Sequence, residues 1–326
     1  MSETVTEHEI IDFAAHIHPD DPPENEFAHR FVERDIGDVY RNIERYSECY
    51  DQAGIDSAVL SQPYYLGHHS AERARSANDA LFEIIRDRPK YYGLASIPTA
   101  AGGEEAAAEF ERCLNAGFNG GALETKTDGI ELHDAEVEPI LEVADQTGAP
   151  ILVHPKLNES LHPDALDDTW MLNAVFGREV ALAESICKVV HTGVLDRYPN
   201  LNLVYHHTAG NIASMMGRIH NQMEKFPPEV WAGSADDQIK SYREFKRQLE
   251  SRIYLDISGH YGQNSTLRTA LSEFPTSQLL FGTDFPFETR TTEDFDQFVN
   301  SVGAECSETD AHRIFSENAL NLLVAA

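Results

Sequence analysis

The sequence predicts an α/β protein built as a closed (β/α)8 barrel, and three observations lead to this fold class. Short apolar runs recur along the chain, amphipathic stretches separate them, and no dinucleotide-binding turn follows the first run. Runs of this length with helices between them are typical of parallel β/α units. Eight units favour a closed barrel. The expected strands are residues 10–17, 57–62, 91–98, 120–125, 150–155, 201–208, 253–259 and 279–286.

The stretches between the runs have the periodicity of surface helices. Examples are SANDALFEIIRDR (76–88), GEEAAAEFERCLNAG (103–117), EVEPILEVADQTG (136–148) and REVALAESICKVV (178–190). Glycine or proline follows several of them, as is common where a helix ends. The alternation of strand and helix therefore continues through most of the chain.

The main rival fold is an open, doubly wound sheet. It has little support because no G-x-G-x-x-G follows the first run. The 326 residues contain no linker rich in proline, glycine or serine, so we expect one barrel domain over 1–326. Two long intervals predict insertions, at about 156–170 and 222–250. The first follows a strand, so it is expected on the face where barrel enzymes place their active sites.

Composition limits the classes of function. Of the chain, 41% is hydrophobic, enough for a sizeable core, but no apolar run approaches the ~20 residues of a membrane helix. The N-terminal MSETVTEHEI lacks the features of a signal peptide, so a cytoplasmic location is expected. Four cysteines lie far apart, which indicates reduced thiols and not a disulfide framework or a zinc knuckle.

The chain is strongly acidic, with 55 acidic residues against 25 basic ones and a net charge of −30. This balance argues against a nucleic-acid partner or an anionic membrane surface, since both require positive charge. High net acidity keeps proteins soluble and is used by halophiles, so a salt-rich cytoplasm is our hypothesis. The alternative is an ordinary acidic protein from a low-salt cell.

Metal-ligand side chains collect at the ends of the expected strands. They are His16 and His18 after the first, His154 after the fifth, His206 and His207 after the sixth, and Asp284 after the eighth. In a parallel barrel these ends converge on one face. Imidazoles and a carboxylate suit a divalent transition metal such as zinc, and three or four such ligands with one open position make a catalytic site.

Each residue also has a simpler interpretation. A lone His-x-His pair is weak, and His154 before a proline can merely end a strand. Adjacent strand residues point to opposite faces, so one of His206 and His207 is expected to face the helices. The segment G-T-D-F-P can be a turn in which Asp284 caps a helix. Together, however, ligand types at four strand ends favour a metal site.

At this point the sequence resembles the amidohydrolase-related family typified by aminocarboxymuconate-semialdehyde decarboxylase. The resemblance covers nearly the whole chain. It is carried by GIDSAVLSQP, NDALFEIIRDRPKYYGLASIP, GFNGGALET, APILVHP, HTGVLDRYPNLNLVYHHTAGN, LLFGTDFPF and HRIFSENALNLL, in that order. The resemblance implies a distorted (β/α)8 barrel (TIM barrel) of the metal-dependent hydrolase type.

The resemblance also implies roles for individual residues. His154 matches a metal ligand on the fifth strand, and Asp284 matches a residue that binds metal and handles a proton. His207, and not His206, aligns with the catalytic histidine. Thr208 and Ala209 replace the usual glycines.

The first strand, IIDFAAHIHPD, departs from the family pattern. If the strand is extended, Asp12, Ala14, His16 and His18 share one face. The family usually places its first ligand two residues after the aspartate, where this chain has Ala14. Two registers remain open: His16 and His18 form the ligand pair, or His16 binds alone and Ala14 leaves a gap.

The leading functional hypothesis is a metal-dependent, non-oxidative decarboxylase of a small unsaturated or aromatic carboxylic acid. His207 would act as the base, and Asp284 would bind the metal and assist proton transfer. The ion is expected to be zinc, with manganese as the alternative, and no organic cofactor is needed. Lys126, Lys156 and Arg290 are candidates for binding the substrate carboxylate.

Two other functions stay open. The first is hydrolysis of a lactone or amide bond, which would use the same residues. The second is a metal-free barrel that only binds a ligand, an idea that Ala14 motivates. The resemblance further implies a homodimer.

Overall fold

The structure is a computed structural model that describes residues 8–19, 36–155, 169–227, 230 and 239–324. Its main sheet has eight strands in the order β1-β2-β3-β4-β7-β8-β9-β10. Every paired neighbour in it is parallel. The strands are β1 (Ile11–His16), β2 (Ser57–Ser61), β3 (Tyr91–Ser96), β4 (Gly120–Glu124), β7 (Ile151–His154), β8 (Leu203–Tyr205), β9 (Ile253–Asp256) and β10 (Leu279–Leu280).

The segment after β10 returns to β1 and closes the barrel. Phe13 N donates to Phe281 O over 2.8 Å, and Asp284 N donates to Ala14 O over 2.9 Å. A parallel bridge between Ala15 and Phe285 continues this contact. The predicted (β/α)8 barrel is therefore confirmed, with all eight expected strands in place. The last strand is short because most of its contact with β1 is made by irregular backbone.

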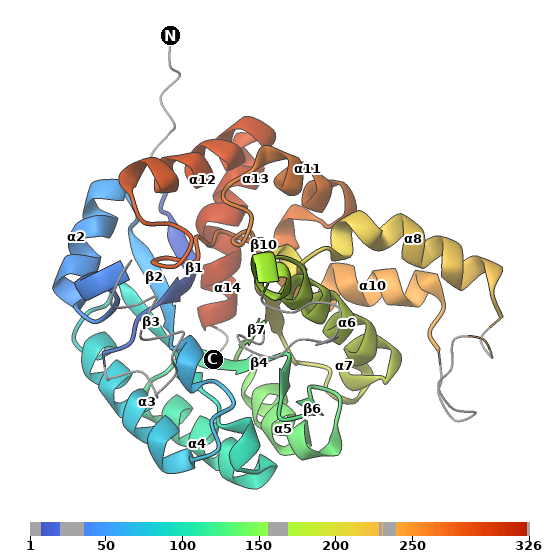
Figure 1. Ribbon diagram of the computed structural model, residues 1–326, viewed down its shortest axis with the longest axis horizontal. Helices are drawn as coiled ribbons and strands as arrows, with labels where there is room; N and C mark the ends of the chain where they lie inside the picture. Colours follow the sequence, from blue (N-terminus) through green and yellow to red (C-terminus); the bar gives the residue numbers. More distant parts are fainter. Residues whose placement is uncertain (1–7, 20–35, 156–168, 228–229, 231–238, 325–326) are drawn as a thin grey trace.

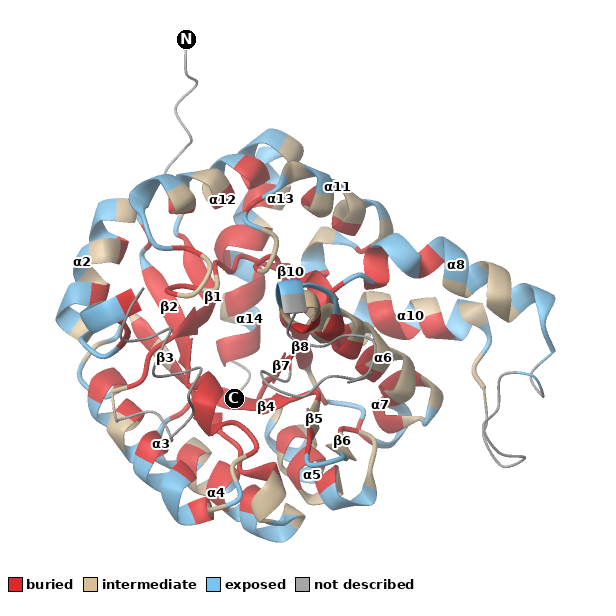
Figure 2. Cartoon of the chain, viewed as in Figure 1, coloured by how far each residue is buried: buried red, intermediate tan, exposed pale blue. Residues whose placement is uncertain are grey.

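Helices surround the barrel (Figure 1). Their inward faces are buried and their outward faces exposed (Figure 2). The four helices predicted from periodicity are present as α3, α4, α5 and α6. The α-helices are α2 (Ile43–Ala53), α3 (Ala71–Ile85), α4 (Gly103–Ala116), α5 (Glu138–Thr147), α6 (Arg178–His191), α7 (Val194–Arg197), α8 (Ile212–Lys225), α10 (Tyr242–Arg252), α11 (Asn264–Glu273), α12 (Thr292–Glu305), α13 (Glu308–His312) and α14 (Asn318–Val324).

The C-terminal helix α14 packs under the barrel. Its Ala319, Leu322 and Leu323 join an apolar cluster with inward-facing strand residues such as Phe13 and Leu152. This cluster fills the amino-terminal half of the barrel interior. Polar chemistry is therefore restricted to the opposite mouth, where the carboxyl ends of the strands meet.

Two regions add to the basic barrel. A small antiparallel hairpin, β5 (Lys126–Thr127) with β6 (Ile130–Glu131), follows β4 and was not predicted. The helices α8 and α10 project sideways from the ring (Figure 1). The expected insertion at 156–170 lies mostly outside the described residues, as does the middle of the one at 222–250. Within the described part of the chain, no helix has the length and apolarity needed to cross a bilayer.

A β-bulge in β1 decides which side chains enter the barrel. Asp12 pairs with Ala58 and Ala15 pairs with Leu60, so three steps on β1 match two on β2. The extra residue reverses the alternation of faces. Asp12 accepts a hydrogen bond from Tyr50 of α2 on the helix side, whereas His16 faces the barrel mouth. The expectation that Asp12 and His16 share a face therefore fails, because the strand is not regularly extended.

Candidate metal centre

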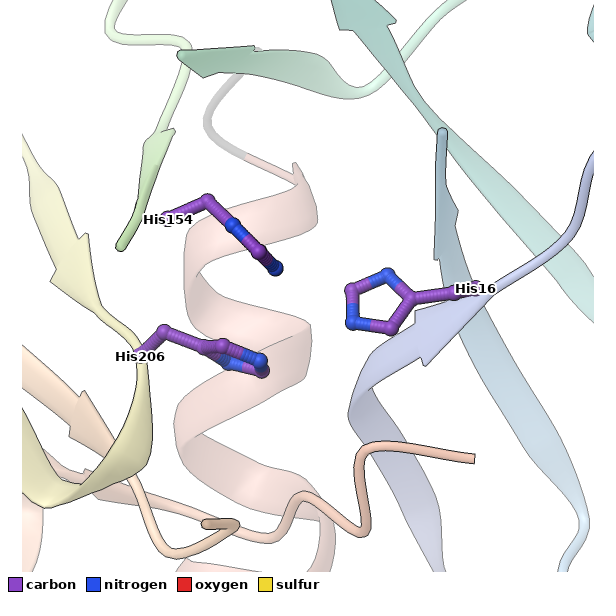
Figure 3. A group of neighbouring side chains, drawn as sticks. All are labelled: His16, His154 and His206. Atoms are coloured by element: carbon purple, nitrogen blue, oxygen red, sulfur yellow. The ribbon is translucent and has the colours of Figure 1, made fainter. Parts of the chain in front are cut away.

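Three imidazoles from three strands converge at the carboxyl-terminal mouth of the barrel (Figure 3). His16 ends β1, His154 ends β7 and His206 follows β8. Their ring centroids are 5.4 Å apart for His16–His154, 5.4 Å for His16–His206 and 4.9 Å for His154–His206. One nitrogen from each ring lies within 4.8 Å of the others. All three residues are buried.

The Nδ1 atoms of His16 and His154 are held by the protein. His154 Nδ1 donates to the carbonyl oxygen of Pro155 over 2.8 Å, which leaves the lone pair on Nε2. His16 Nδ1 lies 2.8 Å from Ser61 Oγ at the end of β2. Burial and the neighbouring imidazoles keep the pKa of His154 well below its usual range. A neutral ring with its Nδ1 anchored presents Nε2 as a metal ligand.

The Nδ1 atom of His206 is also held by the protein, in this case by a carboxylate. Its Nδ1 donates to Asp256 Oδ2 over 2.7 Å, and both side chains are fully buried. The other oxygen of Asp256 accepts from the backbone N–H of Ser258 over 3.1 Å and of His207 over 3.3 Å. Asp256 therefore fixes the direction in which His206 points.

Asp284 lies between the imidazoles, just after β10. Its Oδ1 is 3.0 Å from His16 Nε2 and 3.6 Å from His206 Nε2. Its Oδ2 is 3.7 Å from His207 Nε2. Burial by itself raises the pKa of Asp284, but the three histidines outweigh it and hold the pKa well below the usual range. The residue is therefore a carboxylate at neutral pH.

His207 faces the same centre as His206, contrary to the expectation that one of them faces the helices. The strand has ended at Tyr205, and His207, Thr208 and Ala209 have left-handed backbone with φ of 54°, 57° and 53°. This turn brings the His207 ring back, so that its Nδ1 donates to Glu179 Oε1 over 2.9 Å. Burial lowers the pKa of His207, but Glu179 and Asp284 together raise it well above the ordinary value.

The donor atoms fit a divalent cation. Among the described residues, the Nε2 atoms of His16, His206 and His207 are buried and have no hydrogen-bond partner. His16 Nε2 and Asp284 Oδ1 are close but not aligned as donor and acceptor. Unpaired buried nitrogens are costly, so nitrogens that converge without bonding one another are suited to binding a cation. Imidazole nitrogen and carboxylate oxygen are ligands for zinc and for manganese.

The structure does not bring His18 into this centre. The chain turns away after β1, and the His18 ring lies among Tyr40, Tyr64 and Tyr65 with centroid distances of 4.7, 5.2 and 5.5 Å. Its Nε2 accepts from the backbone N–H of Tyr64 over 3.3 Å. Burial and the nearby His16 keep the pKa of His18 well below its usual range. Its surroundings are those of a neutral structural histidine.

The three cationic candidates for substrate binding have different positions. Lys126 Nζ is 3.3 Å from Glu131 Oε1 across the β5–β6 hairpin. Arg290 follows β10, is exposed, and its Nε donates to Phe287 O over 3.1 Å. Lys156 lies outside the described residues.

Two carboxylates at the site were missed from the sequence. Asp256 lies inside the expected strand 253–259 and ends the observed β9, so an acidic residue within an apolar strand was an available signal. Glu179 lies near the start of α6 and contacts His207 across 28 residues of sequence. Its role depends on the turn after β8, for which the sequence offered no clear signal.

The sequence model of the amidohydrolase family matches residues 11–324, almost the entire chain. The protein belongs to this amidohydrolase family. The family resemblance inferred from the motifs is thus confirmed, and the match begins with the strand that carries His16.

Individual relatives in this family carry decarboxylase names. A 2-amino-3-carboxymuconate-6-semialdehyde decarboxylase of Dictyostelium discoideum is 25% identical over 304 residues, which are 88% of this chain and 80% of the relative. A γ-resorcylate decarboxylase of a Polaromonas species is 28% identical over 83% of this chain and 84% of its own.

A solved structure also matches this amidohydrolase over nearly its full length. The crystal structure of dihydroxybenzoic acid decarboxylase from Polaromonas, with bound manganese and the inhibitor 2-nitroresorcinol, superposes with a TM-score of 0.81. The match covers 98% of this chain and 97% of the other at 24% identity. It supports the barrel fold found here.

Proposed function

We propose that this amidohydrolase is a metal-dependent, non-oxidative decarboxylase of a small aromatic or unsaturated carboxylic acid. The observation that carries the proposal is the convergence of His16, His154 and His206 at the barrel mouth, with Asp284 Oδ1 3.0 Å from His16 Nε2. The Nε2 atoms of His16 and His206 are buried and have no hydrogen-bond partner among the described residues. The decarboxylase names of relatives aligned over more than four-fifths of the chain support the reaction class.

His16, His154 and Asp284 would hold one divalent ion, zinc by our proposal and manganese as the alternative. An ion bound there supplies Lewis acidity toward substrate oxygens. The surrounding protein keeps the donors in position, since Ser61 and Pro155 fix the two rings. The Polaromonas structure of the same fold contains bound manganese, which supports manganese as the alternative ion.

His207 and Asp284 are the proposed proton-handling pair. Glu179 holds His207 Nδ1, so His207 Nε2 is directed at Asp284 Oδ2, 3.7 Å away. A proton carried by this pair would be delivered to the substrate carbon that bears the carboxylate. Positioned acid–base groups of this kind contribute typically about 10²–10⁴-fold to a rate.

The atoms and electrons balance without an oxidant. A carbon–hydrogen bond forms at the carboxylated carbon, using electrons of the unsaturated system. The bond to the carboxylate then breaks, carbon dioxide leaves, and the released electron pair restores the unsaturation. The substrate itself is the electron sink, so no organic cofactor is required.

The test is an assay of the metal-loaded protein on aromatic, muconate-type and pyrone acids. Release of carbon dioxide supports the proposal, and Asp284→Asn is expected to abolish it. Ring opening or amine release without carbon dioxide would instead indicate the hydrolase alternative. Less than about a tenth of an equivalent of bound metal, with no uptake of added zinc or manganese, would indicate a metal-free binding barrel.

Lys126, Lys156 and Arg290 remain proposed partners of the substrate carboxylate. Of the described pair, Lys126 follows β4 and Arg290 follows β10, so both lie in segments after the carboxyl ends of strands. We further propose a single domain that forms a homodimer and works in the cytoplasm. Light scattering of the purified protein tests the dimer.

A further inference from the structure

The first strand supplies a single ligand to the centre. The bulge in β1 turns Asp12 toward Tyr50 of α2, and Ala14 has only a methyl group to offer. His18 lies among tyrosines beyond the end of the strand. Among Asp12, Ala14, His16 and His18, only His16 reaches the centre. The proposed ligands are therefore the imidazoles of His16 and His154 and the carboxylate of Asp284.

The surroundings of His206 are those expected for a metal-binding histidine. Its Nδ1 is bound to the buried Asp256, and its Nε2 is buried, unpartnered and 3.6 Å from Asp284 Oδ1. A carboxylate on the far nitrogen of a histidine is the usual support of a metal ligand, because it fixes the ring and raises the basicity of the near nitrogen. His16, His154 and His206 all have Nδ1 held by the protein.

His207 differs in its position around Asp284. His206 Nε2 approaches Oδ1, the oxygen that also lies near His16, whereas His207 Nε2 approaches Oδ2. His206 belongs both to the close group with His16 and His154 and to a second group with His207 and Asp284, whereas His207 belongs only to the second. The two adjacent histidines therefore have separate positions at the centre.

We propose that His206 is a third imidazole ligand of the divalent ion, held in place by Asp256 and completing a set with His16, His154 and Asp284. The inference rests on the proposed metal-dependent function, and it separates a ligand, His206, from its proton-handling neighbour, His207.

The test compares matched asparagine variants. His206→Asn keeps an N–H donor near the position of Nδ1 for Asp256 and removes Nε2, and His207→Asn makes the same change one residue later. Titration calorimetry with zinc and with manganese measures affinity. Loss of a direct ligand should weaken binding by at least about 100-fold in His206→Asn, beyond the roughly 10–100-fold typical of outer partners. His207→Asn should stay within about threefold of the unmodified protein.

Asp256→Asn provides an independent variant. It should retain the ion with affinity lowered by about 10–100-fold, as expected for a residue that supports a ligand. Unchanged affinity in His206→Asn, or an equal loss in His207→Asn, would overturn the proposal.

A measurement on the unmodified protein avoids any folding defect of the variants. In protein loaded with cobalt(II), each coordinated imidazole with a protonated Nδ1 gives one exchangeable, hyperfine-shifted proton signal by NMR. Three signals are expected, from His16, His154 and His206. Two signals would overturn the third ligand while leaving metal dependence intact. If no cobalt, zinc or manganese binds at all, the proposed function itself fails.

Discussion

Glu179 is the residue that determines how His207 is presented to the centre. Its carboxylate accepts the Nδ1 proton over 2.9 Å, so the ring is held with Nε2 toward Asp284 Oδ2. Glu179 and Asp284 also raise the pKa of His207 well above its ordinary value. Glu179 does not reach the centre through any contact of its own among the described residues. It is therefore a positioning residue, in the way that a carboxylate orients a catalytic histidine in other acid–base pairs.

Replacement of Glu179 tests this role. Glu179→Gln removes the negative charge that raises the pKa of His207 and changes the partner of Nδ1, so we expect kcat to fall by about 10²-fold with little change in KM. Metal content should remain at one equivalent, because the ring of His207 is not a ligand in this account. Steady-state kinetics and elemental analysis check the two expectations. Parallel loss of metal and activity would mean that Glu179 supports the metal ligands instead.

His18 provides the opposite case, a buried histidine outside the centre. In His18→Ala the protein should keep its metal, because the ring lies among tyrosines and its Nε2 binds the backbone N–H of Tyr64. The unfolding free energy should fall by about 1–3 kcal/mol, since that N–H loses its partner. Elemental analysis measures the metal content, and urea denaturation measures the unfolding free energy. Joint loss of metal and activity would restore His18 as a ligand.

At the scale of elements, polar contacts between helices stabilise the outer ring. Glu109 of α4 is buried and accepts hydrogen bonds from Arg112 over 2.8 Å, from Asn78 over 3.0 Å and from Arg75 over 3.1 Å. Asn78 and Arg75 belong to α3. Burial raises the pKa of Glu109, but these bonds outweigh it and lower the pKa to about 2.

This depressed pKa predicts how stability varies with pH. The folded state holds Glu109 ionised more strongly than the unfolded state does, so its contribution is present above the unfolded pKa near 4.5 and lost as pH falls toward 2. The contribution is at most on the order of 3 kcal/mol. In urea denaturation, the stability difference between the unmodified protein and Glu109→Gln should be largest at pH 6 and shrink toward pH 3. A difference independent of pH would contradict the assignment.

The elements also show what the sequence could predict. Strands and helices followed from apolar runs and periodicity because most lie in regular β/α units. The bulge in β1 and the left-handed turn after β8 could not be predicted in this way. The bulge moves Asp12 to the other face, and the turn directs His207 toward the same centre as His206. Strand-end position therefore identified the site, but the roles within it depend on these local irregularities.

At the scale of the whole molecule, acidity is the most unusual property. A net charge of −30 destabilises a compact state through repulsion and favours solubility. Many of the basic residues are already engaged. Arg268, for example, pairs with Glu305 over 2.6 Å, and Lys188 pairs with both Glu131 and Glu184. Because 55 acidic residues face only 25 basic ones, there are too few cationic side chains to pair with every carboxylate.

Salt should therefore stabilise this amidohydrolase. We expect the melting temperature to rise between low and multimolar KCl, because the cation screens the repulsion among carboxylates. Scanning calorimetry at several KCl concentrations measures the change, with sorbitol at matched osmotic strength as the control. A melting temperature that does not rise with KCl would contradict adaptation to a salt-rich cytoplasm.

By our proposal, the centre at the barrel mouth removes a carboxylate with the help of a bound ion. The most direct measurement is carbon-13 NMR of a carboxyl-labelled acid from the panel that the protein consumes. We predict that the label appears as carbon dioxide and bicarbonate with the metal-loaded protein, disappears from these species after chelation, and returns when zinc or manganese is restored. A label that stays in an organic product, or release that survives chelation, would contradict the account.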